Sequence, residues 1–153
     1  MDSFDRKILD LLQRDAGLSV ADIAARAGLS PTPCWRRIRN LEKAGVIKHR
    51  VALLDRDKLG LGVTVYVAVR TREHSAKWLE TLAAAVKALP EVLELHRMSG
   101  DIDYLLKVVV ADIAAYDAFY KRLIDRVPLS DVSSSFAMEE IKSTTALPLP
   151  AAE

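Results

Sequence analysis

The chain has 153 residues, half of them apolar, so it is long enough to bury a core in one domain or in two small ones. No apolar run approaches the roughly 18 residues that span a membrane, and the stretch Met1 to Asp5 carries acid where a signal peptide carries lysine. The single cysteine, Cys34, excludes an internal disulfide, and no cluster of Cys or His has zinc-ligand spacing. We therefore predict a folded cytoplasmic protein without metal or cofactor.

The net charge of +1 is unevenly distributed along the chain. Residues 1–60 hold 12 Lys/Arg against 8 Asp/Glu, whereas residues 61–153 hold 10 against 13. Residues 30–50 alone reach +5, with six basic residues and one acidic residue. A small basic N-terminal domain next to an acidic second half predicts a polyanionic partner for the first part only.

Apolar residues in the first half recur at helical spacing and predict three helices, over residues 3–15, 20–27 and 31–44. Asp2 or Ser3 caps the first helix. For the second helix, Ser19 and Asp22 suit an aspartate variant of the capping box, and Gly28 is placed to end it. For the third, Ser30 is the expected cap, with Pro31 in the first helical position. We expect the third helix to have one buried face and one exposed face. The buried face holds Cys34, Ile38 and Leu41, and the exposed face holds Thr32, Arg36, Arg39, Asn40 and Lys43.

A short helix, a tight glycine turn and a second helix with a basic outward face match a helix-turn-helix, whose second helix enters the DNA major groove. The alternative is a solvated charged helix face. Arg36, Arg39 and Asn40 have the chemistry to read guanine or adenine edges. Trp35 either packs against the domain, which we prefer, or braces a phosphate. The DNA contacts predicted on this helix are Ser30, Thr32, Trp35, Arg36, Arg37, Arg39, Asn40 and Lys43.

Residues 46–54 have strand propensity and a basic middle, and we read them as a short two-stranded wing beside the third helix. Lys48, His49 and Arg50 would then lie against phosphates. Such contacts add affinity and salt dependence but carry no sequence information.

The second half, residues 61–145, predicts the order strand, helix, strand, strand, helix, strand. A period of two from Val63 to Arg70 gives the first strand, and the others are expected over residues 91–99, 104–110 and 131–142. This order is that of the ferredoxin-like α+β sandwich, in which two helices cover one face of an antiparallel sheet. The other face stays open, which favours pairing with a second copy. The proline-containing tail, residues 146–153, is expected to be an extended arm or disordered.

Five stretches together resemble the leucine-responsive regulator family, also called the Lrp/AsnC or feast/famine family. They are Leu29 to Cys34, Arg37 to Glu42, Ala52 to Asp55, Ser99 to Leu106, and Met138 to Lys142. The resemblance implies a winged helix-turn-helix joined to a RAM-type effector domain. It also implies homodimers that assemble further into tetramers or octamers, and a small amino acid bound at the seam between dimers. By motif, the effector site is expected to include Arg97, Met98, Ser99, Gly100, Asp101, Asp103, Ser135 and Phe136.

The residue chemistry of that site leaves alternatives open. Asp101 or Asp103 suits the ammonium group of an amino acid, and Arg97 or backbone N–H groups suit its carboxylate. Gly100 and Asp101 also fit an ordinary hairpin turn that Asp103 caps. Trp35 and residues 131–139 are similar to a branch of the family tied to cysteine and sulfur amino-acid catabolism. The chain departs from the family pattern after Pro128, where a glycine is usual and Leu129 stands instead.

Two other classes of protein compete with a regulator. A haem-biosynthesis decarboxylase of the same build would need imidazole or cationic groups for a tetrapyrrole, and His74 and His96 have no partner at a suggestive spacing. A stand-alone amino-acid-binding module would have no electrostatic reason to keep a basic third helix. We expect Cys34 to be a small apolar packing residue. The sequence therefore predicts a DNA-binding regulator that is not an enzyme.

Overall fold

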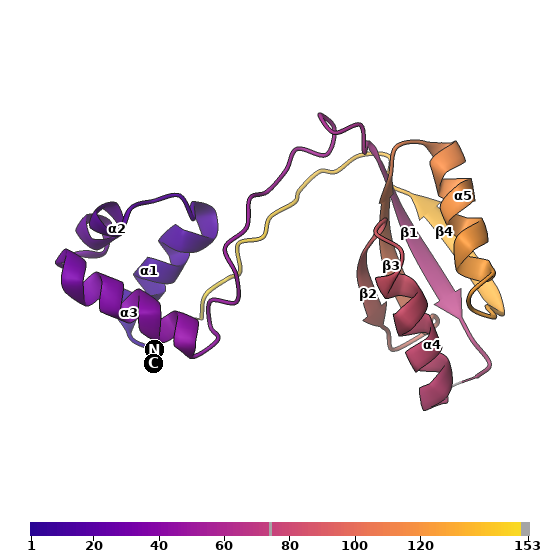
Figure 1. Cartoon of the computed structure of the whole chain (residues 1–153), viewed down its shortest axis with the longest axis horizontal. Helices are drawn as coiled ribbons and strands as arrows, with labels where there is room; N and C mark the ends of the chain where they lie inside the picture. Colours follow the sequence, from indigo (N-terminus) through magenta and orange to yellow (C-terminus); the bar gives the residue numbers. More distant parts are fainter. Residues whose placement is uncertain (74, 151–153) are drawn as a thin grey trace. The chain divides into compact units, whose positions relative to one another are not determined.

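The computed structural model describes residues 1–73 and 75–150, which form two compact units (Figure 1). The head unit, as we name it, comprises Met1–Leu53 and the chain from Ile141 onward, and the sheet unit comprises Leu54–Glu140. The division thus falls several residues before the expected boundary at Gly60, and the chain passes between the units twice. His74 and the last three residues of the tail lie outside the described residues.

Three helices build the head unit: α1 (Ser3–Arg14), α2 (Val20–Ala27) and α3 (Pro31–Lys43). They begin and end within one residue of the predicted bounds. The three apolar stripes meet in one small core, as the helical spacing indicated. Its buried members are Ile8, Leu9, Leu12, Ile23, Ala24, Ala27, Cys34, Ile38 and Leu41.

The ends of the first two helices follow from local side-chain chemistry. Asp2 accepts the backbone N–H of Asp5, and the Asp5 carboxylate accepts the N–H of Asp2, which completes a capping box on α1. Ser19 caps α2 by accepting the N–H of Asp22. Gly28 ends α2 with a φ of 76°, a left-handed conformation that glycine adopts without strain. The turn between α2 and α3 is therefore short and well defined.

The segment from Val46 to Leu54 contains no strand, so the expected two-stranded wing is not formed within this chain. Backbone hydrogen bonds hold its start: the amides of Val46 and Ile47 both bond to the Leu41 carbonyl, and Ile47 packs against the head core. The physical reason is the lack of a turn residue inside the segment. Without Gly, Pro, Asn or Asp between these positions, nothing reverses the chain so that two short strands can pair.

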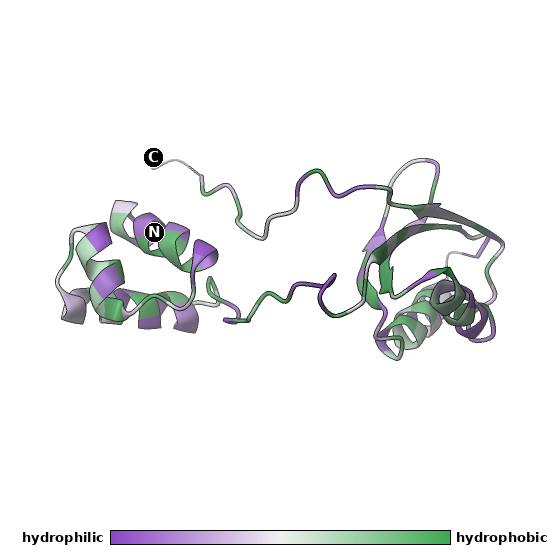
Figure 2. Ribbon diagram, turned by 90° about the horizontal axis from the view of Figure 1, so that it is seen from above, coloured by the Kyte–Doolittle hydropathy of each residue, from purple (hydrophilic) through white to green (hydrophobic). Residues whose placement is uncertain are grey.

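The sheet unit has four antiparallel strands in the order β2-β3-β1-β4, which confirms the ferredoxin-like prediction. Figure 2 shows both helices on one side of this sheet. No helix in the described part of the chain is long and apolar enough to cross a membrane. The elements are β1 (Val63–Arg70), α4 (Ala76–Lys87), β2 (Val92–Arg97), β3 (Tyr104–Val110), α5 (Ile113–Ile124) and β4 (Asp131–Phe136).

The last strand is shorter than the 131–142 that the pattern predicted. Phe136 pairs with Val65, and the amide of Ala137 makes the final bond, to the Thr64 carbonyl. Because β1 begins at Val63, the chain beyond Ala137 has no neighbouring strand to pair with. From Ala137 to Pro150 the chain forms no helix or strand.

The core of the sheet unit lies between the helices and one face of the sheet. Alternate β1 residues, Val65, Val67 and Val69, are fully buried, as the period of two predicted. Leu82 from α4 and Phe119 from α5 cover them with no exposed surface of their own. This core holds the strands of β1 and β3 in register, and so fixes where their loops emerge.

The opposite face of the sheet has no covering element in the described chain. Tyr66 on β1 is 40% exposed there, beside the paired Lys107 of β3. On β2, Glu94 bonds to His96 at 2.9 Å and to Lys107 at 3.4 Å, and these two partners lower the pKa of the Glu94 carboxyl, with His96 the larger cause. A face of mixed polar and apolar residues is thus left to solvent or to a second copy.

Candidate nucleic-acid interface and effector site

The exposed stripe of α3 is the largest set of predicted DNA contacts that the structure brings together. Successive helical residues are rotated by about 100°, so positions 32, 36, 39, 40 and 43 fall within one broad sector opposite the buried stripe of Cys34, Ile38 and Leu41. All five outward side chains are exposed, as predicted: Thr32, Arg36, Arg39, Asn40 and Lys43. The stripe presents three cations, an amide and a hydroxyl on one rigid helix.

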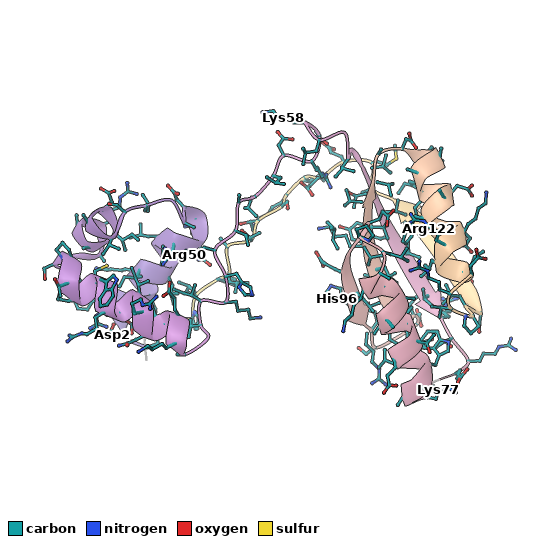
Figure 3. The ribbon with its side chains drawn as sticks, viewed as in Figure 1. Asp2, Arg50, Lys58, Lys77, His96 and Arg122 are labelled. Atoms are coloured by element: carbon teal, nitrogen blue, oxygen red, sulfur yellow. The ribbon has the colours of Figure 1, made fainter. Side chains whose placement is uncertain are left out.

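An ion-pair cluster joins the end of α3 to the segment that follows it. Glu42 accepts from Arg39 at 3.3 Å and from Arg50 at 3.0 Å. Figure 3 shows Arg50 in the chain beyond α3. Lys48 and His49 beside it are exposed. The structure therefore places one end of the basic segment beside the basic stripe, even though no wing strands form.

Arg37 lies outside the stripe and is turned toward α1. Its guanidinium is 2.8 Å from Asp2 and 2.8 Å from Asp5, and it stacks over the Phe4 ring at 5.5 Å (Figure 3 labels Asp2 beside α3). Hydrogen bonds to Asp5 and then Asp2 raise the pKa of Arg37, and the Asp5 backbone N–H is the main cause of a lowered pKa at Asp2. Arg37 thus connects α3 to the start of α1 in this structure, and its predicted DNA contact lies outside the exposed stripe.

Trp35 does not pack into the head core, contrary to our preferred interpretation. Its side chain is 54% exposed. It stands one residue after the buried Cys34, so it lies about 100° around the helix from the core stripe, where α1 and α2 do not reach. The alternative, a ring available to DNA, is the one that this position permits. Ser30 precedes α3 and is exposed, and its side chain makes no capping bond.

Cys34 is completely buried among the apolar residues of the head core. Burial raises the pKa of its thiol above the usual value, which keeps the thiol neutral. A buried neutral thiol is unreactive, so the structure agrees with the packing role predicted for it.

The predicted effector loop joins β2 and β3 and is tied to the end of β1. Gly100 has a φ of 114°, which the turn requires. The Asp103 carboxylate accepts the backbone N–H of Thr71 at 2.8 Å, and its backbone bonds to Val69 and Met98. The Asp103 carboxylate thus ties the loop to the end of β1, while its backbone carbonyl closes the hairpin by accepting the Met98 N–H. Among the described residues the Asp101 carboxylate has no hydrogen-bond partner, while the Asp101 backbone carbonyl accepts from Arg70 at 2.7 Å.

Sequence reasoning missed Arg70 and Thr71 as parts of this site. Arg70 also pairs with Asp131 at 3.2 Å and so connects the effector loop to the start of β4. The sequence signal that could have found them is an arginine followed by a threonine at the end of an apolar strand. Thr71 is buried there, and a buried hydroxyl needs a polar partner.

Ser135 and Phe136 do not meet the loop within one chain. They pair with Tyr66 and Val65, whereas the loop contacts Val69 to Thr71 at the other end of β1. Arg70 lies four positions after Tyr66 along β1, a distance of about 13 Å in a strand. Within the described chain, the two predicted parts of the site therefore lie at opposite ends of β1.

Two family models match the chain, one on each half. Residues 1–48 match winged helix-turn-helix DNA-binding, and residues 64–147 match the Lrp/AsnC ligand binding domain. The head and sheet units thus correspond to a DNA-binding part and a ligand-binding part.

Relatives match the whole chain. The glutamate uptake regulatory protein of Zymomonas mobilis is 56% identical over 150 residues, covering 98% of this chain and 92% of the relative. The crystal structure of an AsnC family transcriptional regulator from Agrobacterium tumefaciens superposes with a TM-score of 0.94 and 60% identity, over 97% of each chain. A Neisseria meningitidis transcriptional regulator solved as a complex with L-Met has a TM-score of 0.92 and 37% identity, over 97% of this chain and 96% of that one. This chain belongs to the Lrp/AsnC family of DNA-binding transcription regulators.

Proposed function

We propose that α3 reads operator sequence with the stripe described above and that the following basic segment holds the phosphates. The observation that carries the proposal is the division of α3 into a buried stripe and an opposite exposed stripe that holds Arg36, Arg39 and Lys43. The guanidinium of an arginine can donate two hydrogen bonds to the edge of a guanine, and the side-chain amide of Asn40 can pair with the edge of an adenine. Lys48, His49 and Arg50 would supply the salt-dependent, sequence-independent part of the affinity.

We further propose that a small amino acid binds between chains and changes the assembly. The loop at 98–103 and the residues Ser135 and Phe136 belong to one predicted site but lie at opposite ends of β1, which supports a pocket built from neighbouring copies. The Neisseria relative was solved with L-Met, a ligand of the proposed class. We assign the ligand's ammonium group to the Asp101 carboxylate, because the Asp103 carboxylate already accepts the Thr71 N–H.

The open sheet face supports a homodimer. Pairing two such faces would remove Tyr66 and the neighbouring half-buried Leu105 from water, and a two-fold pair supplies two α3 helices for a two-part operator. Further assembly to tetramers or octamers would bring the effector loops of neighbouring dimers together. Ligand binding there would shift the spacing of several heads, which couples the amino acid to DNA.

The alternatives from other classes are not favoured. A decarboxylase would place histidine in its cleft, whereas His96 is exposed on β2 and bonded to Glu94. A stand-alone binding module would lack operator preference, which the basic α3 stripe opposes. We propose that the protein acts as a regulator and not as an enzyme, in the cytoplasm at the nucleoid where its DNA lies.

The decisive experiment is a titration of DNA from upstream of the protein's own gene, with random DNA as the control. Each titration is repeated at several salt concentrations and with methionine, glutamate, leucine or cysteine. We expect tight, salt-sensitive binding of the upstream DNA that one amino acid alters. Equal affinity for random DNA would contradict the readout proposal, and indifference to every amino acid would contradict the effector proposal.

A further inference from the structure

The last part of the chain returns to the DNA-binding head unit. We call residues 141–150 the arm. Gln13 of α1 holds it through the backbone of a single residue: Gln13 Nε2 donates to the Leu147 carbonyl at 3.1 Å, and the Leu147 N–H donates to Gln13 Oε1 at 2.9 Å. Two residues later, the half-buried Leu149 packs against the apolar core of the head. The arm is therefore held by a polar clamp and an apolar anchor.

Neighbouring side chains orient the Gln13 clamp. Asp10, one turn earlier, accepts from Gln13 Nε2 at 3.3 Å and from Arg14 at 3.0 Å. Hydrogen bonds from Arg14 and Gln13 lower the pKa of Asp10, with Arg14 the larger cause, so the acceptor stays charged at neutral pH. A charged acceptor on one side fixes the amide group of Gln13 toward the Leu147 carbonyl and leaves Oε1 facing the Leu147 N–H. Among neutral side chains, only a carboxamide offers both a donor and an acceptor in this fork.

The arm leaves the sheet unit from a point that is also held. Glu140 pairs with Arg56 at 3.6 Å, and Arg56 bonds to the hydroxyl of the buried Thr64 on β1. Arg56 lies in the linker that carries the chain from the head into β1. Two segments therefore connect the head to the sheet unit: the linker before β1, and the arm. Among the described residues, the clamp and the anchor are the contacts that join the arm to the three helices of the head.

We propose that the arm is a second tether on the DNA-binding head and that Gln13 is a positioning residue for operator binding. A head held by one extended linker samples many positions and must lose that freedom when two heads engage spaced half-sites. A docked arm removes part of the freedom before DNA binds. This inference rests on the proposed engagement of two heads at once. It assigns to Gln13, which lies outside the α3 stripe, control over how much variation in half-site spacing the protein tolerates.

The test compares Gln13→Ala with Leu147→Ala in the full-length protein. Gln13→Ala removes both bonds of the clamp and keeps a good helix former in α1. Leu147→Ala is the matched control, because the Leu147 side chain is 71% exposed and its contacts to Gln13 use the backbone. Hydrogen exchange at residue 147 should be about 10-fold faster in Gln13→Ala and unchanged in the control. A chain ending at Lys142 provides a second release of the arm.

The affinity of each variant is measured for two operators. One has the natural half-site spacing, and the other has 5 base pairs inserted between the half-sites, about half a helical turn. For the unaltered protein we expect the insertion to weaken binding strongly. Releasing the arm, by Gln13→Ala or truncation, should shrink that penalty by about 10-fold, and Leu147→Ala should not. Single half-site binding should be unchanged in every variant.

Three results would overturn the inference. A spacing penalty unchanged by either release would mean that the arm does not restrain the head. A change in the size of the assembly on release would assign the arm to oligomerisation instead. If the unaltered protein itself ignores the insertion, the proposed two-head binding fails along with the inference, which separates that case from the first two.

Discussion

Arg37 and Arg39 are two positions apart in α3, and their substitutions should have opposite effects. Arg39 is 58% exposed on the outward stripe and pairs with Glu42 at the surface, at 3.3 Å. A bidentate contact from one arginine to guanine contributes about 1–3 kcal/mol of discrimination. Arg39→Ala should therefore lower the preference for operator over random DNA by about 5- to 150-fold per head. Release of the Glu42 pair is a minor effect, because such exposed pairs contribute at most about 1 kcal/mol.

Arg37→Ala should instead loosen the head and leave DNA readout intact. Its guanidinium bridges Asp2 and Asp5 at the start of α1, on the side of α3 away from the stripe. We expect faster hydrogen exchange in the first turn of α1. Operator affinity should stay within about twofold, because a domain that retains even about 4 kcal/mol of stability is unfolded in only roughly one molecule in a thousand.

The assay is a titration of each variant against operator and random DNA over a range of salt, with hydrogen exchange on the same samples. Arg39→Lys is the control that keeps the charge but loses the fork, so it should retain random-DNA affinity and lose discrimination. Equal losses on operator and random DNA for Arg39→Ala would mean that Arg39 holds a phosphate. A loss of discrimination in Arg37→Ala as large as in Arg39→Ala would refute the assignment of the two faces.

Three further predictions concern the two units separately. Asp101→Ala should leave thermal stability unchanged and weaken the effect of the amino acid on DNA binding. Asp103→Ala leaves the Thr71 N–H at the end of β1 without its acceptor, so it should also lower the sheet unit's stability by about 1–3 kcal/mol in denaturant titrations. Equal stability losses in the two variants would contradict this division of roles. The pKa of the Asp2 carboxyl is lowered from 3.8, so its contribution to head stability is present above pH 3.8 and disappears as the pH falls through the lower folded pKa. Asp2→Asn should therefore flatten the acid dependence of hydrogen exchange in α1. An unchanged pH profile would mean that Asp2 does not cause this dependence. Leu82→Ala, at a fully buried site, should lower the sheet unit's unfolding free energy by about 2–5 kcal/mol. A loss below about 1 kcal/mol would show that neighbouring side chains move in and fill the cavity.

Periodicity predicted most of the fold because each element carries its own pattern. The stripe of Cys34, Ile38 and Leu41 predicted which face of α3 is buried, and the alternation from Val63 to Arg70 predicted which side of β1 meets the helices. The order of these elements, together with short turns, was enough to predict the ferredoxin-like sheet. Capping residues such as Ser19 and Gly28 located the helix ends, since caps act within a few residues.

The errors fall where a residue's partner is distant in sequence or absent. The segment 46–54 has strand propensity, but a strand forms only when a neighbouring strand is in place, and none of the described residues provides one. Trp35 is apolar enough for a core position that the neighbouring helices do not cover. In both cases the local pattern was sound, and the tertiary arrangement decided the outcome.

The sequence by itself determined the element order, the two-part organisation, the basic face of α3 and membership of a regulator family, because these depend on local periodicity, charge and motifs. Only the tertiary structure decided that Arg37 binds Asp2 and Asp5, that Asp103 holds the Thr71 amide, and that Gln13 grips the Leu147 backbone. Each of these contacts joins residues more than 30 positions apart. A charged or amide side chain suits many partners equally well, so its role is set by which partner the folded chain brings within hydrogen-bond distance.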